Sequence, residues 1–78
     1  MIKVLFFAGY KEELGMDQLE IESEHIETVQ QLKEYIQNKY AISSLQQVLT
    51  AVNEEFVTND DPIHSGDTVA FIPPVSGG

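Results

Sequence analysis

Residues 2–8 read IKVLFFA, and this run of β-branched and aromatic residues predicts a β-strand. Side chains alternate between the two faces of a strand. One face would carry Ile2, Val4 and Phe6, and the other would carry Lys3, Leu5 and Phe7. Large apolar residues therefore occupy both faces, so we expect apolar surface on both sides of the sheet built on this strand.

Four further stretches predict strands, each bounded by turn residues. They are residues 17–23, 48–53, the very short 56–57, and 68–72. Residues 9–16, between the first two strands, have a glycine near each end and are predicted as a loop. Pro73 and Pro74 end the last strand, because proline has no N–H group to donate to a neighbouring strand.

A helix is predicted from Thr28 onward. The Thr28 hydroxyl can cap the first turn, and Gln31 three residues later completes a capping-box pattern. The apolar stripe at helical spacing consists of Val29, Leu32, Ile36 and Tyr40. The residues off this stripe are Gln30, Gln31, Lys33, Glu34 and Gln37. The helix therefore has one face to bury and one face for solvent.

The predicted order is strand, strand, helix, strand, short strand, strand. A mixed sheet of about five strands with one main helix packed on one face satisfies this order, which is an α+β architecture. The order resembles the β-grasp fold of ubiquitin. We expect residues 1–72 to form this domain and residues 73–78 to form an extended carboxyl-terminal tail.

The first and last strands are neighbours in a β-grasp sheet. Their outward-facing residues would then form one apolar patch of Leu5, Phe7, Ala70 and Ile72. Contiguous exposed apolar patches usually mark interfaces. We therefore predict a docking face for a partner protein here; the alternative is a loop that folds over the patch.

The composition limits the classes of function. The 78 residues include 13 acidic residues, four lysines and no cysteine, with a net charge of −9. This charge disfavours nucleic acid and anionic membranes, and it suits either a partner with a basic face or simple solubility. No apolar run is long enough to span a membrane, so a cytoplasmic location is expected. The lack of cysteine excludes a disulfide, a thiolate metal ligand and a thiol nucleophile.

The histidines and acidic pairs do not predict a catalytic or metal site. His25 and His64 lie in predicted loops without converging partners. The acidic pairs at 54–55 and 60–61 lack the ligand spacing of a calcium loop. We expect surface histidines and solvated acidic turns, with no bound cofactor or metal.

The sequence ends in PPVSGG, residues 73–78. The prolines favour a stiff extended base, and the glycines leave a narrow tip without side chains. Such a segment reaches roughly 20 Å when extended, which is enough to enter the pocket of a partner. A frayed terminus is the alternative interpretation.

The reactive group at the tip would be the carboxylate of Gly78. A carboxylate is a poor electrophile, so acyl chemistry requires activation, most simply as a mixed anhydride with AMP. A sulfur nucleophile that displaces AMP would leave a terminal thiocarboxylate. Because the chain has no cysteine, this sulfur would come from outside.

The segments MIKVLFFAG, AVNEEFV and GDTVAFIPPVSGG, with the spacing between them, resemble the small subunit of molybdopterin synthase along the whole chain. This is a family of ubiquitin-like sulfur carriers in molybdenum-cofactor biosynthesis. The resemblance implies that an activating enzyme of the ubiquitin-activating type adenylates Gly78 with ATP. Sulfur transfer would then make the thiocarboxylate, which donates sulfur to cyclic pyranopterin monophosphate to build the dithiolene of molybdopterin.

The resemblance also implies roles for residues. Gly78 would carry the sulfur, and Gly77 would give clearance in the active site of the large subunit. The threaded segment would be Pro73, Pro74, Val75 and Ser76. The apolar patch would dock on the large subunit in a heterotetramer, with one small subunit at each end of a central dimer. The chain would be a sulfur-donating subunit without catalysis of its own.

Three alternatives remain open. A sulfur carrier for thiamine thiazole has a similar fold and ending, although its tail generally lacks the double proline. A ubiquitin-like protein modifier would join targets through Gly78. A plain binding module would not need its terminal glycines.

Overall fold

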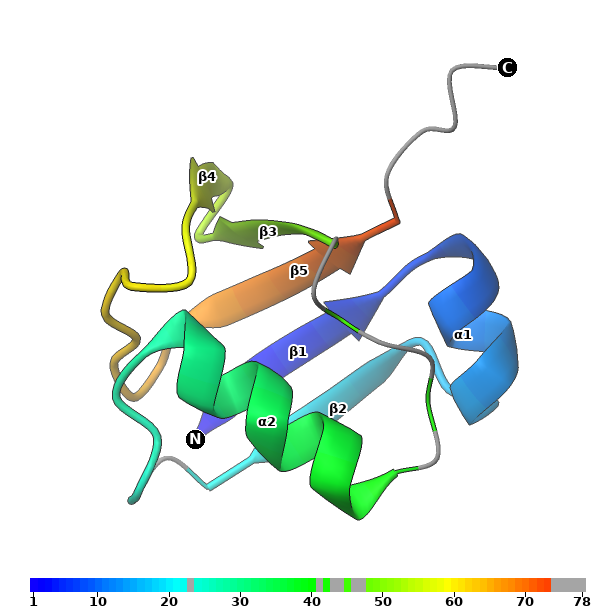
Figure 1. The fold of residues 1–78 in the computed structure, drawn as a ribbon, viewed down its shortest axis with the longest axis horizontal. Coiled ribbons are helices and arrows are strands. Elements are labelled where there is room, and N and C mark those ends of the chain that lie inside the picture. The colour runs from blue at the N-terminus through cyan, green and yellow to red at the C-terminus, as the bar shows by residue number, and fades with distance from the viewer. Residues whose placement is uncertain (23, 41, 43–44, 46–47, 74–78) are drawn as a thin grey trace.

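The computed structural model describes residues 1–22, 24–40, 42, 45 and 48–73. Its elements are β1 (Ile2–Phe6), α1 (Ala8–Leu14), β2 (Gln18–Ile21), α2 (Val29–Lys39), β3 (Leu49–Val52), β4 (Glu55–Val57) and β5 (Thr68–Ile72). Figure 1 shows one sheet with α2 lying across one face and α1 beyond the carboxyl end of β1. The mixed sheet with a main helix on one face confirms the predicted architecture.

The two central strands of the sheet come from opposite ends of the chain. The strand order is β2-β1-β5-β3-β4; β1 and β5 run parallel, and the other pairs are antiparallel. Leu5 lies opposite Ala70, and Phe6 lies opposite Phe71. The first and last strands are therefore neighbours, as predicted.

The hydrophobic core lies between the sheet and α2. Its residues that are at most 1% exposed include Ile2, Val4, Phe6, Val69 and Phe71 from the sheet and Val29, Leu32 and Ile36 from α2. The rings of Phe6 and Phe71 pack at 6.2 Å between centroids with an interplanar angle of 39°. Burial of each large side chain contributes about 1.5–3 kcal/mol relative to its exposed state. The predicted inward faces of β1, β5 and α2 are confirmed.

Helix α2 begins where its capping residues predict. Thr28 is the N-cap, and its Oγ1 accepts a hydrogen bond from the Gln31 backbone N–H at 3.2 Å. The Gln31 side chain accepts from the backbone N–H of Glu27 at 2.7 Å, which lies one residue before the cap. The reciprocal bond of a capping box would go to Thr28 itself, so the pattern is confirmed with its second bond shifted by one residue.

Lys33 corrects the predicted solvent face of α2. It was expected off the apolar stripe, but its side chain is only 2% exposed. Position 33 follows Val29 by four residues, and this spacing also belongs to the buried face of a helix. The Nζ atom donates a hydrogen bond to Asn59 Oδ1 at 2.6 Å, and burial lowers the pKa of Lys33. The buried amine therefore connects α2 to the loop that follows β4.

Helix α1 corrects the predicted loop at residues 9–16. The chain enters the helix directly after β1 and leaves it at Gly15, whose φ of 71° permits the left-handed turn. Tyr10 and Leu14 pack against the core, as does Met16 after the helix. Gly9 costs about 1 kcal/mol of helix stability relative to alanine, so this helix depends on packing that sequence periodicity does not reveal.

Three strands are shorter than predicted. β1 ends at Phe6, β2 spans Gln18–Ile21, and β3 spans Leu49–Val52. β3 ends there because Asn53 begins the turn to β4. The return strand at 56–57 is extended by one residue, and β5 spans the predicted residues.

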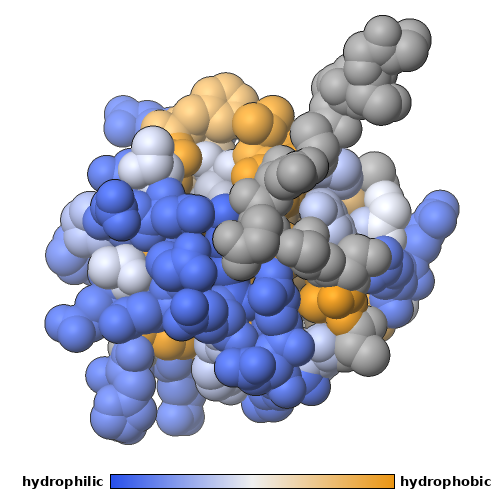
Figure 2. Space-filling model, in the orientation of Figure 1, coloured by the Kyte–Doolittle hydropathy of each residue, from blue (hydrophilic) through white to orange (hydrophobic). Residues whose placement is uncertain are grey.

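The side of the molecule that carries α2 is mainly hydrophilic. Figure 2 shows this face toward the viewer, with hydrophobic residues gathered at the edge near β4. The charge of −9 accounts for much of the polar surface. No helix in the described ranges is long and apolar enough to cross a membrane. Two of the exposed large apolar side chains, Leu49 and Phe56, lie on strands of the sheet, and Phe7 directly follows β1.

Thr50 offers a test of the packing between β3 and the core. Its side chain is 4% exposed, and its Oγ1 has no hydrogen-bond partner within the described chain. We expect Thr50→Val to raise the free energy of unfolding by about 1 kcal/mol, because a buried unpaired hydroxyl is replaced by a methyl group of similar size. Urea unfolding measures this change.

The matched control is Thr58→Val. The Thr58 hydroxyl is exposed and lies 3.4 Å from its hydrogen-bond acceptor, Asp61 Oδ2. This variant should gain no stability. A loss of stability in Thr50→Val would show that its hydroxyl does have a partner.

Candidate functional site

A row of apolar residues crosses the outer face of the sheet, on the side away from α2. The row follows the strand register: Leu5 is opposite Ala70, Ala70 is opposite Ala51, and Ala51 is opposite Phe56. The two central residues are small and the two outer residues are large. Four strands thus form a surface with a low centre and raised sides.

This surface encloses an open hollow with a volume of about 360 Å³. Its lining residues are Leu5, Phe7, Ala51, Asn53, Glu54, Phe56, Thr68, Ala70 and Ile72. Phe7 is 44% exposed and Phe56 is 73% exposed. Leu49, next to Ile72 across the sheet, is also 44% exposed. We call this surface the apolar hollow.

The structure brings all four residues of the predicted docking patch together. Leu5, Phe7, Ala70 and Ile72 all line the apolar hollow. Their role in docking stays a prediction. The sequence interpretation missed Ala51 and Phe56, although the same alternation that separates the faces of β1 also applies in β3 and β4.

One rim of the hollow is a tight turn between β3 and β4. Asn53 and Glu54 have positive φ angles of 52° and 72°. Asn53 donates a side-chain hydrogen bond to Asp67 Oδ1 at 3.0 Å, and its Oδ1 accepts one from the Thr68 backbone N–H at 3.0 Å. The other carboxylate oxygen of Asp67 accepts from the His64 backbone N–H at 2.8 Å. These bonds fix the turn against the start of β5.

The same bonds shift the titration of Asp67. The hydrogen bond from the His64 backbone, followed by the one from the Asn53 side chain, lowers the pKa of Asp67 below its ordinary value of 3.8. The ionised carboxylate is therefore part of the structure that holds the turn.

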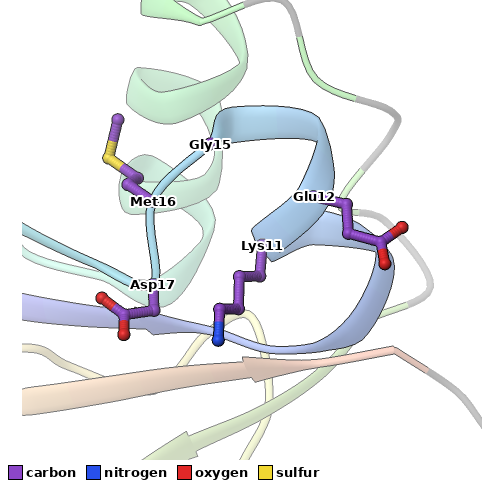
Figure 3. Close-up of a pocket in the computed structure, with 5 residues that line it drawn as sticks. All are labelled: Lys11, Glu12, Gly15, Met16 and Asp17. Atoms are coloured by element: carbon purple, nitrogen blue, oxygen red, sulfur yellow. The ribbon is translucent and has the colours of Figure 1, made fainter.

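The opposite side of the outer face carries a cation. Lys11 lines a hollow together with Leu5 and Phe7, and it also lines a wider one beyond α1. In the close-up of the wider hollow, the side chains of Lys11, Glu12 and Asp17 point in different directions (Figure 3). The geometry of acid–base catalysis requires converging groups, and these side chains do not converge.

The remaining polar candidates form no centre either. His25 and His64 are both exposed, as predicted. Within the described residues, no three histidine, cysteine, aspartate or glutamate side chains lie close enough together to hold a metal ion. The apolar hollow is therefore the candidate functional site within the described residues.

The predicted tail begins where the hollow ends. β5 stops at Ile72, whose side chain lines the hollow, and Pro73 follows outside the strand. The predicted roles of Pro74, Val75, Ser76, Gly77 and Gly78 concern positions outside the described residues. The chain thus leaves the sheet beside the exposed apolar surface.

The strand order and the long helix across the sheet define a ubiquitin-like β-grasp protein with an apolar hollow on its outer face. The comparison with known proteins is more specific. The model of the ThiS family matches residues 4–78, so the chain belongs to the ThiS family. The chain is 40% identical to the molybdopterin synthase sulfur carrier subunit of Escherichia coli, and the alignment covers both chains completely.

Solved structures agree on the fold. The putative molybdopterin converting factor subunit 1 from Pyrococcus furiosus has a TM-score of 0.80 at 29% identity, covering 95% of this chain and 97% of that one. SAMP1 from Haloferax volcanii has the same score at 20% identity, covering 99% and 98%. A complex of subunits 1 and 2 of molybdopterin-converting factor from Helicobacter pylori gives a TM-score of 0.65 at 23% identity, covering 99% and 97%. The two likenesses at lower identity show the fold alone.

Asp67→Asn tests the bonds that hold the turn. At neutral pH we expect the variant to be about 1 kcal/mol less stable, because charged hydrogen bonds are strong but this site is partly solvated. The pKa of Asp67 is lower in the folded state, so the advantage of the wild type is complete above pH 3.8. It is lost as the pH falls through the lowered pKa. Thermal unfolding at several pH values measures the difference.

Asp60→Asn is the control, since Asp60 is an exposed residue of a nearby loop. At neutral pH this variant should be as stable as the wild type, because no described residue bonds to the Asp60 side chain. A difference between Asp67→Asn and the wild type that stays constant down to the lowest pH would contradict the stabilising role of the carboxylate.

Proposed function

We propose that this chain is the sulfur-donating subunit of molybdopterin synthase. The observation that carries the proposal is the 40% identity, over both complete chains, to a molybdopterin synthase sulfur carrier subunit. The ending PPVSGG and the apolar hollow beside it supply the two parts that such a carrier needs, a reactive tip and a docking surface.

The chemistry proposed for the tip takes place at Gly78. Its carboxylate attacks the α-phosphate of ATP in an activating enzyme, which releases pyrophosphate and forms an acyl adenylate. A sulfur nucleophile from a separate donor then displaces AMP and leaves the thiocarboxylate. The chain contributes no thiol to these steps, because it has no cysteine.

The sulfur is then transferred to cyclic pyranopterin monophosphate in the active site of the large subunit. Hydrolysis of the acyl group returns Gly78 to the carboxylate, and two such transfers complete the dithiolene. Pro73, Pro74, Val75 and Ser76 form the segment that enters the active site. Gly77 keeps the backbone narrow next to the reacting group.

The docking step uses the apolar hollow. Exposed apolar surface of this kind gives most of its binding energy through a few large side chains, and Phe7 and Phe56 are the most exposed of those that line the hollow. Because β5 ends at the hollow, a large subunit that covers this face receives the tail directly. The Escherichia coli relative at 40% identity is named as a subunit of molybdopterin synthase, and this supports a large-subunit partner here. The assembly we propose is a heterotetramer.

The β-grasp fold does not by itself separate a sulfur carrier from a protein modifier. The full-length identity to a sulfur carrier subunit favours the carrier, as does the double proline before the glycines. A modifier would accumulate as isopeptide adducts, whereas a carrier cycles between carboxylate and thiocarboxylate.

Deletion of Gly78 tests the chemistry. Incubation of the wild type with ATP, the activating enzyme and a sulfur source should raise its intact mass by the exchange of one oxygen for one sulfur. The deleted chain should fold with unchanged stability and show no such shift. A mass shift in the deleted chain would contradict the assignment of Gly78 as the sulfur carrier.

Phe7→Asp and Phe56→Asp test the docking face. Each should raise the Kd for the large subunit at least about tenfold, because a charge would be buried against apolar surface. Phe7 is the N-cap of α1 without a side-chain cap, and aspartate is a good N-cap, so Phe7→Asp should not unfold the domain. Isothermal titration calorimetry gives the Kd, and thermal unfolding checks the fold.

Tyr35→Asp is the matched control on the α2 face. Tyr35 is 36% exposed, and its hydroxyl accepts a hydrogen bond from Lys39. Its substitution should leave the Kd nearly unchanged. Equal losses in all three variants would show that the apolar hollow is not the docking face.

A further inference from the structure

The turn between β3 and β4 places a glutamate where the backbone favours glycine. Asn53 and Glu54 are the two central residues, and both have positive φ angles, 52° and 72°. Two-residue turns of this kind strongly prefer Asn-Gly, because glycine has no Cβ to clash in the left-handed region. Asn53 fits that preference and Glu54 does not. The conformation of Glu54 is therefore strained.

Hydrogen bonds of Asn53 hold the turn in this conformation. The Asn53 side chain bonds to Asp67 and to the backbone of Thr68, and the Asn53 backbone N–H donates to the Thr68 carbonyl at 2.8 Å. These three bonds attach the first turn residue to β5. Glu54 must follow in the left-handed conformation. Strain that is enforced in this way is found most often where a side chain has a function.

Nothing within the described chain explains the choice of glutamate. Glu54 is exposed, and its carboxylate has no hydrogen bond or ion pair with any described residue. Its neighbour Glu55 faces the opposite way along β4 and lines a different, polar hollow. Glu54, in contrast, lines the apolar hollow. The strained residue thus stands at the rim of the surface assigned to docking.

The β3–β4 turn itself carries negative charge, and Lys3 lies one strand away, opposite Thr68. The sequence contains no lysine or arginine after Lys39, so β3, β4, β5 and their loops carry acidic residues only. The cations near the outer face are Lys3 on β1 and Lys11 on α1, on the other side of β5. A partner that covers the hollow meets negative charge at the β3–β4 turn. Charge complementarity then requires a basic group on the partner at this point.

We propose that Glu54 determines partner specificity: its carboxylate forms an ion pair at the rim of the apolar hollow with a lysine or arginine of the large subunit. The inference rests on the proposed function and adds the chemistry of the partner at one position. In this proposal the strain is tolerated because a side chain at position 54, on the rim of the hollow, contacts the partner. Glycine would relieve the strain and lose the contact.

The experiment measures the Kd for the purified large subunit and the thermal stability of three variants. Glu54→Gln removes the charge, Glu54→Gly removes the charge and the strain, and Glu55→Gln removes a neighbouring charge that faces away from the hollow. At about 20 mM salt we expect Glu54→Gln and Glu54→Gly to raise the Kd about threefold. This difference should fade toward 0.5 M salt because exposed ion pairs are screened.

The stability measurement separates strain from charge. Glu54→Gly should raise the Tm by roughly 3 °C, while Glu54→Gln should leave it near that of the wild type. Glu55→Gln should change neither the Kd nor the Tm appreciably. A residue whose backbone strain lowers the Tm and whose carboxylate strengthens binding would fit the proposed role in docking.

The outcomes distinguish this inference from the proposed function. If the wild type binds the large subunit and Glu54→Gln binds equally well, the ion pair is overturned while the proposed function stands. Equal losses for Glu54→Gln and Glu55→Gln would also overturn it, because overall charge alone would then explain the effect. If Glu54→Gln weakens binding to the activating enzyme but not to the large subunit, the assignment of the ion pair to the large subunit is overturned. Failure of the wild type to bind the large subunit would overturn both.

Discussion

The parallel pairing of β1 with β5 is the contact on which both faces of the sheet depend. Its register places Phe6 beside Phe71 on the inner face and Leu5 beside Ala70 on the outer face. A shift of one residue would exchange the two faces. The inner contacts bury the core under α2, and this burial strongly favours one register. The outer surface is therefore specified by the packing of the opposite side.

The apolar hollow follows from residue size as well as from hydrophobicity. Ala51 and Ala70 lie side by side in the two strands that pair at its floor, and large side chains flank them. A sheet face of uniformly large residues would be flat or convex. Small residues between large ones leave a hollow instead. The net charge of −9 supplies repulsion between copies of the chain, which opposes self-association through this exposed surface.

Sequence periodicity predicted the elements in which the spacing of apolar residues alone decides which face is buried. The apolar runs of β1 and β5 and the stripe of α2 were sufficient, because burial follows directly from their spacing. Helix α1 was missed because Gly9 weakens its local signal, and its stability comes from Tyr10 and Leu14 packing on the core. Phe56 was missed as part of the hollow because its place there depends on pairing with β3. Alternation separates the two faces of β4, but only its pairing with β3 decides that Phe56 lies beside Ala51.

The residues that form the core are different from those proposed to carry out the chemistry. The core lies between α2 and the inner face, while the reactive position that we propose lies beyond β5, after Pro73. The central strand β5 ends at Ile72, at the rim of the apolar hollow. Strain is concentrated at another rim of the same surface, where the bonds of Asn53 hold the turn. A stable core allows the outer face to keep exposed apolar residues and a strained turn that do not stabilise the domain itself.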